Sequence, residues 1–482
     1  MAIGFKEPRH WDITSNSSPV VAINTIRAFL FMAGLTTDVY SSIDVSVAFL
    51  QSNPYDEDAP KRYVVYKPHR YAAPRYYQLK GSIYGQRSAS RQWFDTLAGW
   101  LEEKGYKQQE DEPCAFINDK GFKVLTYVDD LICRGSQEET DRFYILLGKR
   151  FDCKDYTILS PDNKLAFLGF DITMSCNYMN TTDIKDKWTD EMIQNIQVDD
   201  KGNFMMIHMD QSDIIQTYLN TQEYNPILNI SSPMGNKYHL LSEPEPLQGD
   251  DTNTFQSMVG TLNYIAGTTR YDISYPVARL AQFAANPTVG SIKAARKVLS
   301  YLAATQDFKI SGIMLPKQDS LEYYSDSDHA GDMPITTYSH TGTVIMLNKV
   351  PIHWRSKKQP KTSRSSAEAE IYALSDTLAD ARLNNWRLID IGVKVDPIIN
   401  ICVDNNQAKV FADNTCVNSK LRTAFSLKHE WVKELRDAGK VKVIQIPAAI
   451  NISDFLTKVQ PGYKVTLYNK MINPYKIKPK DN

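Results

Sequence analysis

Two neighbouring aspartates, Asp129 and Asp130, stand between two apolar runs of the sequence. The alternation from Phe122 to Val128 predicts one β-strand and Leu131–Cys133 predicts the next, so the pair lies at the tip of a hairpin. Aspartate is depleted in strands and like charges repel, so local stability gives no reason for this pair. A bound divalent cation would give one. The alternative is a surface β-turn, in which acidic residues are ordinary.

Five further acidic residues stand where an apolar strand ends or a helix begins: Asp44, Asp326, Glu370, Asp404 and Asp454. Carboxylate oxygens are the ligands that Mg²⁺ prefers, and paired divalent ions are a common means of transferring or cleaving phosphate esters. Each of these acids, taken alone, is better explained as a cap, a turn residue or a solvated side chain.

A stretch of 34 residues, Lys61–Phe94, contains no acidic side chain but eight basic ones interleaved with six tyrosines. Basic side chains neutralise phosphates and aromatic rings stack on bases, so the stretch could bind nucleic acid. A solvated basic strand pair is the alternative. A second stretch without acids, His353–Ser366, includes Lys357 and Lys358.

Length and composition indicate an ordinary soluble globular protein. The 482 residues allow two to four domains, and 42% hydrophobic residues with a net charge of −1 suit packed cores. The six cysteines form no C-x-x-C pair, which favours a reducing compartment and disfavours a zinc site. No apolar run is long enough for a membrane span, and the first residues lack a signal-peptide core, so we expect neither a secreted nor a membrane-spanning protein.

The first half resembles the reverse transcriptases of copia-type LTR retrotransposons. Tyr127-Val128-Asp129-Asp130 resembles their polymerase hairpin, and Asp44 lies in a segment similar to their first catalytic motif. The resemblance implies that Asp44, Asp129 and Asp130 hold two Mg²⁺ ions. It also implies that Phe49 crowds the ribose 2′ position, although Phe49 as plain core packing stays open. The segment Gln78–Phe94 and the Phe167–Ile172 strand are similar to regions that contact template, nucleotide and primer. The residues implied to contact nucleotide or nucleic acid are Phe49, Tyr84, Gly85, Arg87, Arg91, Tyr127 and Gly169, together with Lys357 and Lys358 of the second basic stretch.

The last third resembles the ribonuclease H domain of the same elements. Four segments are similar to family motifs in family order, and they contain Asp326, Glu370, Asp404 and Asp454. The resemblance implies that these four carboxylates converge on two further Mg²⁺ ions. Glu368 is explained by the helix dipole alone, and Ser366 is expected to cap that helix.

The expected fold class is α/β. We expect a reverse transcriptase palm with incomplete fingers at 1–180, a mostly helical thumb and connection at 181–318, a ribonuclease H-like domain at 319–465 and a tail at 466–482. A helix is expected within residues 17–36, and the polar stretch 176–203 is expected to be irregular. Gly4-Phe5-Lys6-Glu7 resembles a segment that follows the fingers, so the chain is expected to be a polyprotein piece truncated at its N-terminal fingers.

The resemblance implies an RNA-directed DNA polymerase with RNA–DNA hybrid ribonuclease activity. Its cofactor would be Mg²⁺, two ions per site, with Mn²⁺ as a substitute. Its partners would be an RNA template, a DNA primer, RNA–DNA hybrid and dNTPs, without a membrane, and the oligomeric state stays open. It would act inside the cell, in a cytoplasmic virus-like particle or the nucleus. The alternative is a truncated, polymerase-inactive remnant that binds nucleic acid or retains only ribonuclease activity.

Overall fold

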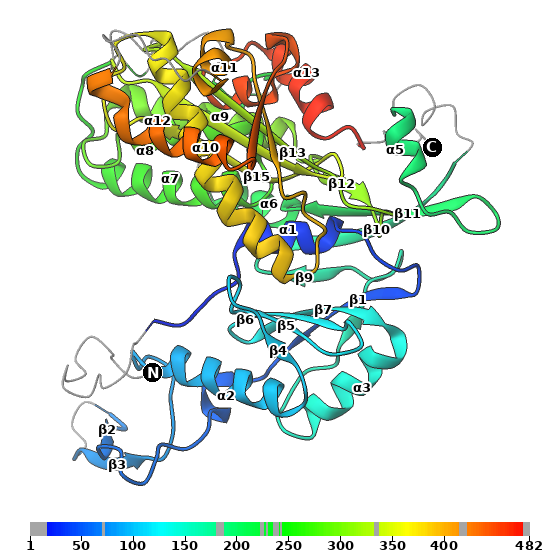
Figure 1. Cartoon of the computed structure of the whole chain (residues 1–482). Helices are drawn as coiled ribbons and strands as arrows, with labels where there is room; N and C mark the ends of the chain where they lie inside the picture. The colour runs from blue at the N-terminus through cyan, green and yellow to red at the C-terminus, as the bar shows by residue number, and fades with distance from the viewer. Residues whose placement is uncertain are drawn as a thin grey trace. The chain divides into compact units, whose positions relative to one another are not determined.

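The computed structural model describes residues 17–69, 73–179, 188–221, 226–227, 230–234, 241, 243–331, 337–413 and 422–475. The chain forms two compact units (Figure 1). The first consists of Met1–Ala22 and Leu35–Leu168, and the second of Ile23–Gly34 and Gly169–Asn482. A short N-terminal segment therefore belongs to the unit that the C-terminal part of the chain builds.

The first unit is built on a six-stranded sheet whose order is β4-β5-β6-β7-β1-β8. Its strands are β1 (Asp38–Asp44), β4 (Lys107–Gln108), β5 (Ala115–Ile117), β6 (Lys123–Tyr127), β7 (Asp130–Ser136) and β8 (Thr157–Ile158). The remaining elements are η3 (Ala48–Gln51), α2 (Ala89–Glu103), α3 (Gln137–Gly148) and the short strand β9 (Leu165–Phe167). The hairpin predicted around the two aspartates is confirmed by the antiparallel pair β6–β7.

Large aromatic side chains fill the core between the helices and this sheet. The Trp93 ring packs edge-on against Phe151 at 5.3 Å between centroids, and Trp100 contacts both Phe151 and Phe143. A Cβ atom at Gly135 would lie 2.6 Å from the Phe122 side chain, so only glycine lets the strands of the hairpin approach this closely. The hairpin is therefore closely packed against this core.

A separate two-stranded ribbon, β2 (Arg62–Tyr66) and β3 (Arg75–Leu79), carries part of the basic, tyrosine-rich stretch. Its side chains are mostly exposed. Because successive residues of a strand point to opposite faces, Tyr66 and Tyr77 share one face and Tyr63 and Tyr76 the other.

The first part of the second unit combines an antiparallel sheet with helices. Its strands β10 (Phe170–Tyr178), β11 (Asn203–Asp210) and β12 (Ile310–Ile313) pair in sequence. Its helices are α5 (Asp190–Gln194), α6 (Ser212–Thr221), α7 (Asp250–Thr268), η5 (Tyr271–Ile273), α8 (Ser274–Ala281) and α9 (Val289–Ala304). The stretch 176–203, expected to be irregular, holds the end of β10 and the helix α5.

The last part of this unit is a five-stranded sheet in the order β15-β14-β13-β16-β17. Its strands are β13 (Leu321–Asp328), β14 (His340–Leu347), β15 (Val350–Lys358), β16 (Ile399–Val403) and β17 (Val441–Gln445). Strand β13 pairs antiparallel with β14 and parallel with β16, and β16 pairs parallel with β17. These mixed sheets with flanking helices confirm the α/β class.

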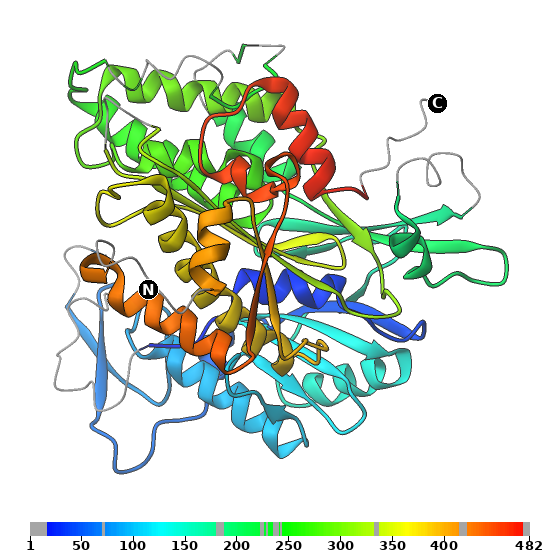
Figure 2. The ribbon, with the colours of Figure 1, turned by 45° about the horizontal axis from the view of Figure 1, so that its top comes forward.

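Helices and short turns of the second unit accompany this sheet. They are α1 (Ile23–Phe31), α10 (Ser366–Asp390), α11 (Asn406–Asp413), α12 (Arg422–Asp437), η6 (Ala448–Ile450), η7 (Ile452–Leu456) and α13 (Gly462–Ile472). The helix expected within 17–36 is thus the shorter α1. The tail expected from residue 466 begins inside α13, where Tyr468 and Ile472 are buried. Turned forward in Figure 2, the second unit shows α13 and the turn η7 before it as neighbouring parts of its ribbon, in agreement with their contacts.

Candidate active sites

Three of the predicted acids meet at one edge of the first unit's sheet. Asp44 is the last residue of β1 and pairs in register with Asp130, the first residue of β7. The Val45 amide donates a hydrogen bond to the Asp129 carbonyl oxygen at 2.9 Å. The sequence separates Asp44 from the two aspartates by more than 80 residues, and the sheet brings them together.

The turn that presents Asp129 consists of Val128 and Asp129, because Tyr127 pairs with Asp130 across the hairpin. Val128 has a φ of 56°, a left-handed conformation that a β-branched residue adopts only under constraint. The fully buried Trp93 donates its indole N–H to the Val128 carbonyl oxygen at 2.6 Å. The sequence analysis gave Trp93 no role at the site. The only sequence feature that pointed to Trp93 was its place in the segment Gln78–Phe94, which resembles a family motif.

The carboxylates of this site repel one another. Burial, followed by the charges of Asp129 and Asp44, raises the pKa of Asp130 to about 6, and Lys154 opposes this rise. The Lys154 ammonium forms an ion pair with the Asp44 carboxylate, and its amide donates to the Asp44 carbonyl oxygen at 3.0 Å. Lys154 is a second residue that the sequence analysis missed, since nothing in the sequence links it to a residue 110 positions away.

Two aromatic rings stand beside these carboxylates. The ring of Phe49, half-buried in η3, lies 4.8 Å from the ring of Tyr84 between centroids. Burial and then the charges of Asp129 and Asp44 raise the pKa of Tyr84. The role of Phe49 beside a ribose stays a prediction. The next residue, Gly85, has a φ of 90°, a conformation that glycine adopts without strain.

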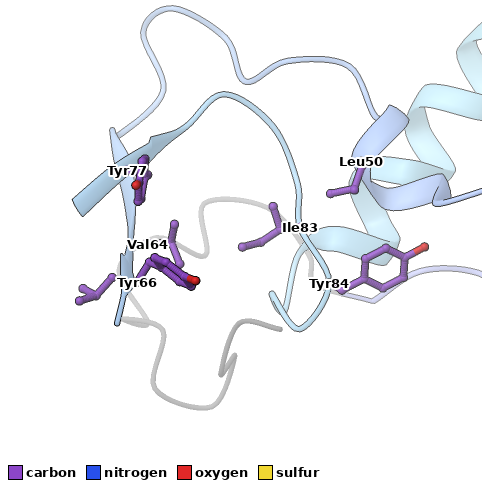
Figure 3. Close-up of a pocket in the computed structure, with 7 residues that line it drawn as sticks. Leu50, Val64, Tyr66, Tyr77, Ile83 and Tyr84 are labelled. Carbon is purple, nitrogen blue, oxygen red and sulfur yellow. The ribbon is translucent and has the colours of Figure 1, made fainter. Parts of the chain in front are cut away.

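An open cavity of about 580 Å³ adjoins Tyr84. Figure 3 shows it between the β2–β3 ribbon, which contributes Tyr66 and Tyr77, and a wall formed by Leu50 and Tyr84. The whole lining is Leu50, Val64, Val65, Tyr66, Tyr77, Ile83 and Tyr84. Its width and aromatic lining suit a flat, partly apolar ligand.

The remaining predicted contacts of this unit are Tyr127, which precedes the turn, and Arg87 and Arg91, which do not line the cavity. Tyr127 and Arg87 are half-buried. The Arg91 guanidinium pairs with the Asp95 carboxylate at 2.9 Å on the surface of α2, so a phosphate would have to compete with Asp95 for it.

Three acids of the second unit form a tight cluster. Asp326 on β13, Glu370 on α10 and Asp404 just after β16 offer carboxylate oxygens that lie within 4.8 Å of one another. The register of the sheet explains the closeness of the strand residues, since β13 and β16 run parallel and side by side. Within the part of the chain that the structure describes, these three residues are the group of possible metal ligands whose ligand atoms lie this close together.

Asp454, the fourth predicted acid, lies in η7 next to the same cluster. A Cβ atom at Gly342, the residue opposite Asp326, would lie 2.5 Å from the Ser453 carbonyl oxygen, so glycine is what lets η7 approach the sheet. From η7's end, the Thr457 hydroxyl donates to the Asp326 carboxylate at 2.8 Å. Glycine at this position had given no signal in the sequence.

The carboxylates of the cluster are buried or half-buried and repel one another when charged, so a cation between them would stabilise their charged form. Burial, then the charges of Asp454 and Asp404, raise the pKa of Asp326 to about 8. Burial, then Asp326 and Asp404, raise the pKa of Glu370, and burial raises that of Asp404. An all-oxygen set of buried, mutually repelling carboxylates fits hard divalent cations such as Mg²⁺.

The other predicted residues of the second unit lie elsewhere. Glu368 is in the first turn of α10, where its side chain accepts the Arg364 amide at 2.7 Å. The helix is capped by Ser365 and not by Ser366 as predicted, because Ser365 keeps an extended backbone and its side chain accepts the Glu368 amide.

Lys357 is exposed on β15, and the Lys358 ammonium lies 4.2 Å from the centre of the Tyr338 ring. Gly169 precedes β10 with a φ of 73°, and a Cβ there would lie 2.9 Å from the Tyr264 hydroxyl. The segment Gly4–Glu7 lies outside the described residues. No helix in the described part of the chain is long and apolar enough to cross a membrane.

Comparison with known proteins gives one family match. Residues 1–211 match the family described as reverse transcriptase (RNA-dependent DNA polymerase). The retrovirus-related Pol polyprotein from transposon RE2 of Arabidopsis thaliana is 26% identical over 99% of this chain and 30% of its own length. That from transposon TNT 1-94 of Nicotiana tabacum is 25% identical over 97% of this chain and 33% of its own length.

The chain thus spans about a third of the length of these relatives. Among solved structures, LC11-RNase H1, isolated from compost, aligns with 29% of this chain and 92% of its own at 18% identity and a TM-score of 0.23.

Proposed function

We propose that the chain is an enzyme with two activities. The premise is that residues 1–211 match the reverse transcriptase family and that nearly the whole chain is similar to Pol polyproteins of copia-type retrotransposons. The first unit would be an RNA-directed DNA polymerase. The second would cut the RNA strand of an RNA–DNA hybrid. The proposal is supported by two observations: Asp44 pairs in register with Asp130 in the first unit, and Asp326, Glu370 and Asp404 offer oxygens within 4.8 Å of one another in the second.

At the polymerase site, Asp44 and Asp129 would be the main ligands of two Mg²⁺ ions and Asp130 the more peripheral one. At the ribonuclease site the ligands would be Asp326, Glu370, Asp404 and Asp454. Bound divalent ions supply an activated oxygen nucleophile and stabilise the leaving oxygen, and Mn²⁺ would serve as a substitute. All seven proposed ligands are carboxylates, whose oxygens suit Mg²⁺ or Mn²⁺ better than the nitrogen- and sulfur-rich ligand sets typical of zinc.

The protein's own side chains would position the substrates. Trp93 would hold the turn that presents Asp129. Phe49 and Tyr84 would form the wall against the sugar of an incoming dNTP, where a 2′-hydroxyl has little room. Gly85 would let the backbone approach the primer–template, and the basic stretch with the ribbon would take the RNA template. Such an enzyme would act in a cytoplasmic particle or the nucleus.

A second candidate function is ribonuclease activity alone. It is favoured by a specific difference between the sites. Three carboxylates of the second unit lie within 4.8 Å of one another, whereas in the first unit the Lys154 ammonium already pairs with Asp44. The polymerase site would then lack the affinity for ions that synthesis requires.

Primer extension on an RNA template with Mg²⁺ and dNTPs, with RNA cleavage read in the same tube, tests both candidates. We expect Asp129→Asn to abolish extension and leave cleavage, and Asp404→Asn to abolish cleavage and leave extension. Cleavage without extension in the unaltered chain would establish the second candidate. If both substitutions leave both activities unchanged, the assignment of the two sites is wrong.

A further inference from the structure

Every oxygen of the Asp454 carboxylate is engaged by a neighbouring side chain. Its Oδ2 accepts hydrogen bonds from the Tyr468 hydroxyl at 2.6 Å and from the Gln460 amide at 3.0 Å. Its Oδ1 forms an ion pair with the Lys458 ammonium. We refer to Lys458, Gln460 and Tyr468 as the Asp454 cradle. Tyr468 lies in the segment 466–482, which was expected to be a tail beyond the ribonuclease H-like domain.

The cradle is held firmly in place. Tyr468 is 4% exposed on α13, and its ring packs against Phe455 of η7 at 5.4 Å between centroids. The carbonyl oxygen of Gln460 accepts the Ser232 hydroxyl at 2.8 Å, which ties this segment to another part of the same unit. The Tyr468 hydroxyl is therefore directed at Asp454 by packing, and its position does not depend on that one hydrogen bond.

The two oxygens of Asp454 differ in what they can bind. Oδ2 holds two neutral donors that are buried with it, and removing them would leave polar atoms unsatisfied. Oδ1 is held by Lys458, whose side chain is 44% exposed and can move into solvent. A divalent cation carries twice the charge of an ammonium, so it can replace Lys458 at Oδ1 more readily than it can strip the donors from Oδ2.

We propose that α13 is a working part of the ribonuclease site, in which Tyr468 and Gln460 position Asp454 to bind a cation through Oδ1 alone, and Lys458 competes with that cation. This inference rests on the proposed ribonuclease function. It makes Tyr468 a positioning residue, because it acts through Asp454. Residues that orient a metal ligand commonly change metal affinity about tenfold or more when removed.

The two halves of the cradle predict opposite effects. Tyr468→Phe keeps the ring against Phe455 but frees Oδ2, so Asp454 loses its orientation and cation binding should weaken about tenfold. Lys458→Met removes the competitor, so cation binding should strengthen several-fold. A merely structural role of the two residues would not give shifts of opposite sign.

The test is a titration of the whole chain with Mn²⁺, read by electron paramagnetic resonance without nucleic acid, in an Asp129→Asn background that weakens the polymerase site. The matched control is Tyr463→Phe, the same change at a 72% exposed tyrosine of α13. We expect binding to weaken in Tyr468→Phe, to strengthen in Lys458→Met and to stay constant in Tyr463→Phe. In hybrid cleavage, the half-saturating Mg²⁺ concentration of Tyr468→Phe should rise while the KM for hybrid stays constant.

Unchanged Mn²⁺ affinity in both Tyr468→Phe and Lys458→Met, or shifts of the same sign, would overturn the proposal. If Tyr468→Phe lowers the unfolding temperature so far that it cannot be titrated, Gln460→Met removes the other donor to Oδ2 and should weaken binding in the same direction. Failure of the ribonuclease function is distinguishable. In that case the unaltered chain cleaves no hybrid, or its Mn²⁺ binding does not respond to Asp404→Asn.

Discussion

At the scale of single residues, the buried carboxyl of Asp326 links the second unit's stability to pH and to metal. Its pKa of about 8 in the folded protein lies above the value of about 4 for an unfolded chain. A group whose pKa is raised by folding stabilises the protein below the unfolded pKa, and this contribution is lost as the pH rises through the folded value. The affected window is therefore about pH 4 to 8.

We expect that, in the presence of a chelator, the unfolding temperature of the second unit falls by about 5 °C or more between pH 5 and pH 8. Mg²⁺ should raise it more at pH 8 than at pH 5, because the cation binds the charged carboxylates. Thermal unfolding at several pH values measures this. Asp326→Asn is the control, since it removes one of the three carboxyl groups with raised pKa values and should weaken both dependences. An equal Mg²⁺ effect at pH 5 and pH 8 would contradict the prediction.

The effect of the Trp93 hydrogen bond on primer extension can also be tested with a single substitution. Trp93→Phe retains an aromatic ring against Phe151 but loses the N–H that holds the Val128 carbonyl, so the strained turn can relax away from its left-handed conformation. We expect the kcat of primer extension to fall about tenfold, the value of one lost buried hydrogen bond, while hybrid cleavage is unchanged.

Trp100→Phe is the matched control for Trp93→Phe, because Trp100 packs on the same Phe151 ring from the same helix. Steady-state kinetics of both variants separate the lost hydrogen bond from the lost volume. Equal losses of kcat in the two would show that ring volume, and not the bond to the turn, matters.

At the scale of elements, the β2–β3 ribbon presents two pairs of tyrosines that differ mainly in the face they occupy. Tyr66 and Tyr77 line the cavity next to Tyr84, whereas Tyr63 and Tyr76 lie on the opposite face. All four are about half-exposed or more, so none is essential to a core. Substitution of Tyr63 and Tyr76 can therefore serve as the control for substitution of Tyr66 and Tyr77.

If the cavity takes a template base by stacking, replacing Tyr66 and Tyr77 by leucine should weaken binding of primer–template with a single-stranded RNA overhang about tenfold or more, since one stacked base contributes about 1–3 kcal/mol. Replacing Tyr63 and Tyr76 by leucine should have little effect. Fluorescence anisotropy with overhangs of increasing length, at fixed salt, measures both. Equal losses from the two faces would indicate a general nucleic-acid surface and not a base pocket.

At the scale of the whole molecule, a helix from the beginning of the sequence belongs to the unit built mainly from the later residues. Helix α1 belongs to the second unit, where the buried Arg27 guanidinium donates to the carbonyl oxygens of Gly267, Thr268 and Ile352 and lies 3.7 Å from the Trp354 ring centre. Arg27 therefore closes the end of α7 and joins it to β15. The first unit has a buried arginine of its own, Arg134, which pairs with Asp38 at 3.3 Å.

We expect Arg27→Met to destabilise the second unit by about 3 kcal/mol, because the buried carbonyl groups of Thr268 and Ile352 lose their donor, as does the exposed Gly267 carbonyl. Arg134→Met should instead destabilise the first unit, since it leaves Asp38 without its charge partner. Hydrogen exchange read peptide by peptide assigns each loss of protection to a unit. Loss of protection in both units from either substitution would mean that they unfold together.

The sequence by itself determined the local features of this protein, because they depend on neighbouring residues. The alternation around Asp129 and Asp130 predicted the hairpin, and the segments before Asp326 and Asp404 predicted strands that the structure confirms. Even for local features the sequence-based prediction was wrong where two neighbouring residues could both cap a helix. Ser365 caps α10, whereas Ser366 was predicted to do so. The assignment of roles to the seven acids came from resemblance and stays a proposal.

Only the tertiary structure decided which distant groups act on one another. Lys154 reaches Asp44, Trp93 holds Val128 and Tyr468 holds Asp454 through contacts that no periodicity encodes, since a salt bridge or a hydrogen bond across a fold depends on packing directions and not on spacing along the chain. The same holds for Gly342, whose missing side chain lets η7 approach the sheet. Burial, which follows from the completed core, raises the pKa values of Asp130, Asp326, Glu370 and Asp404.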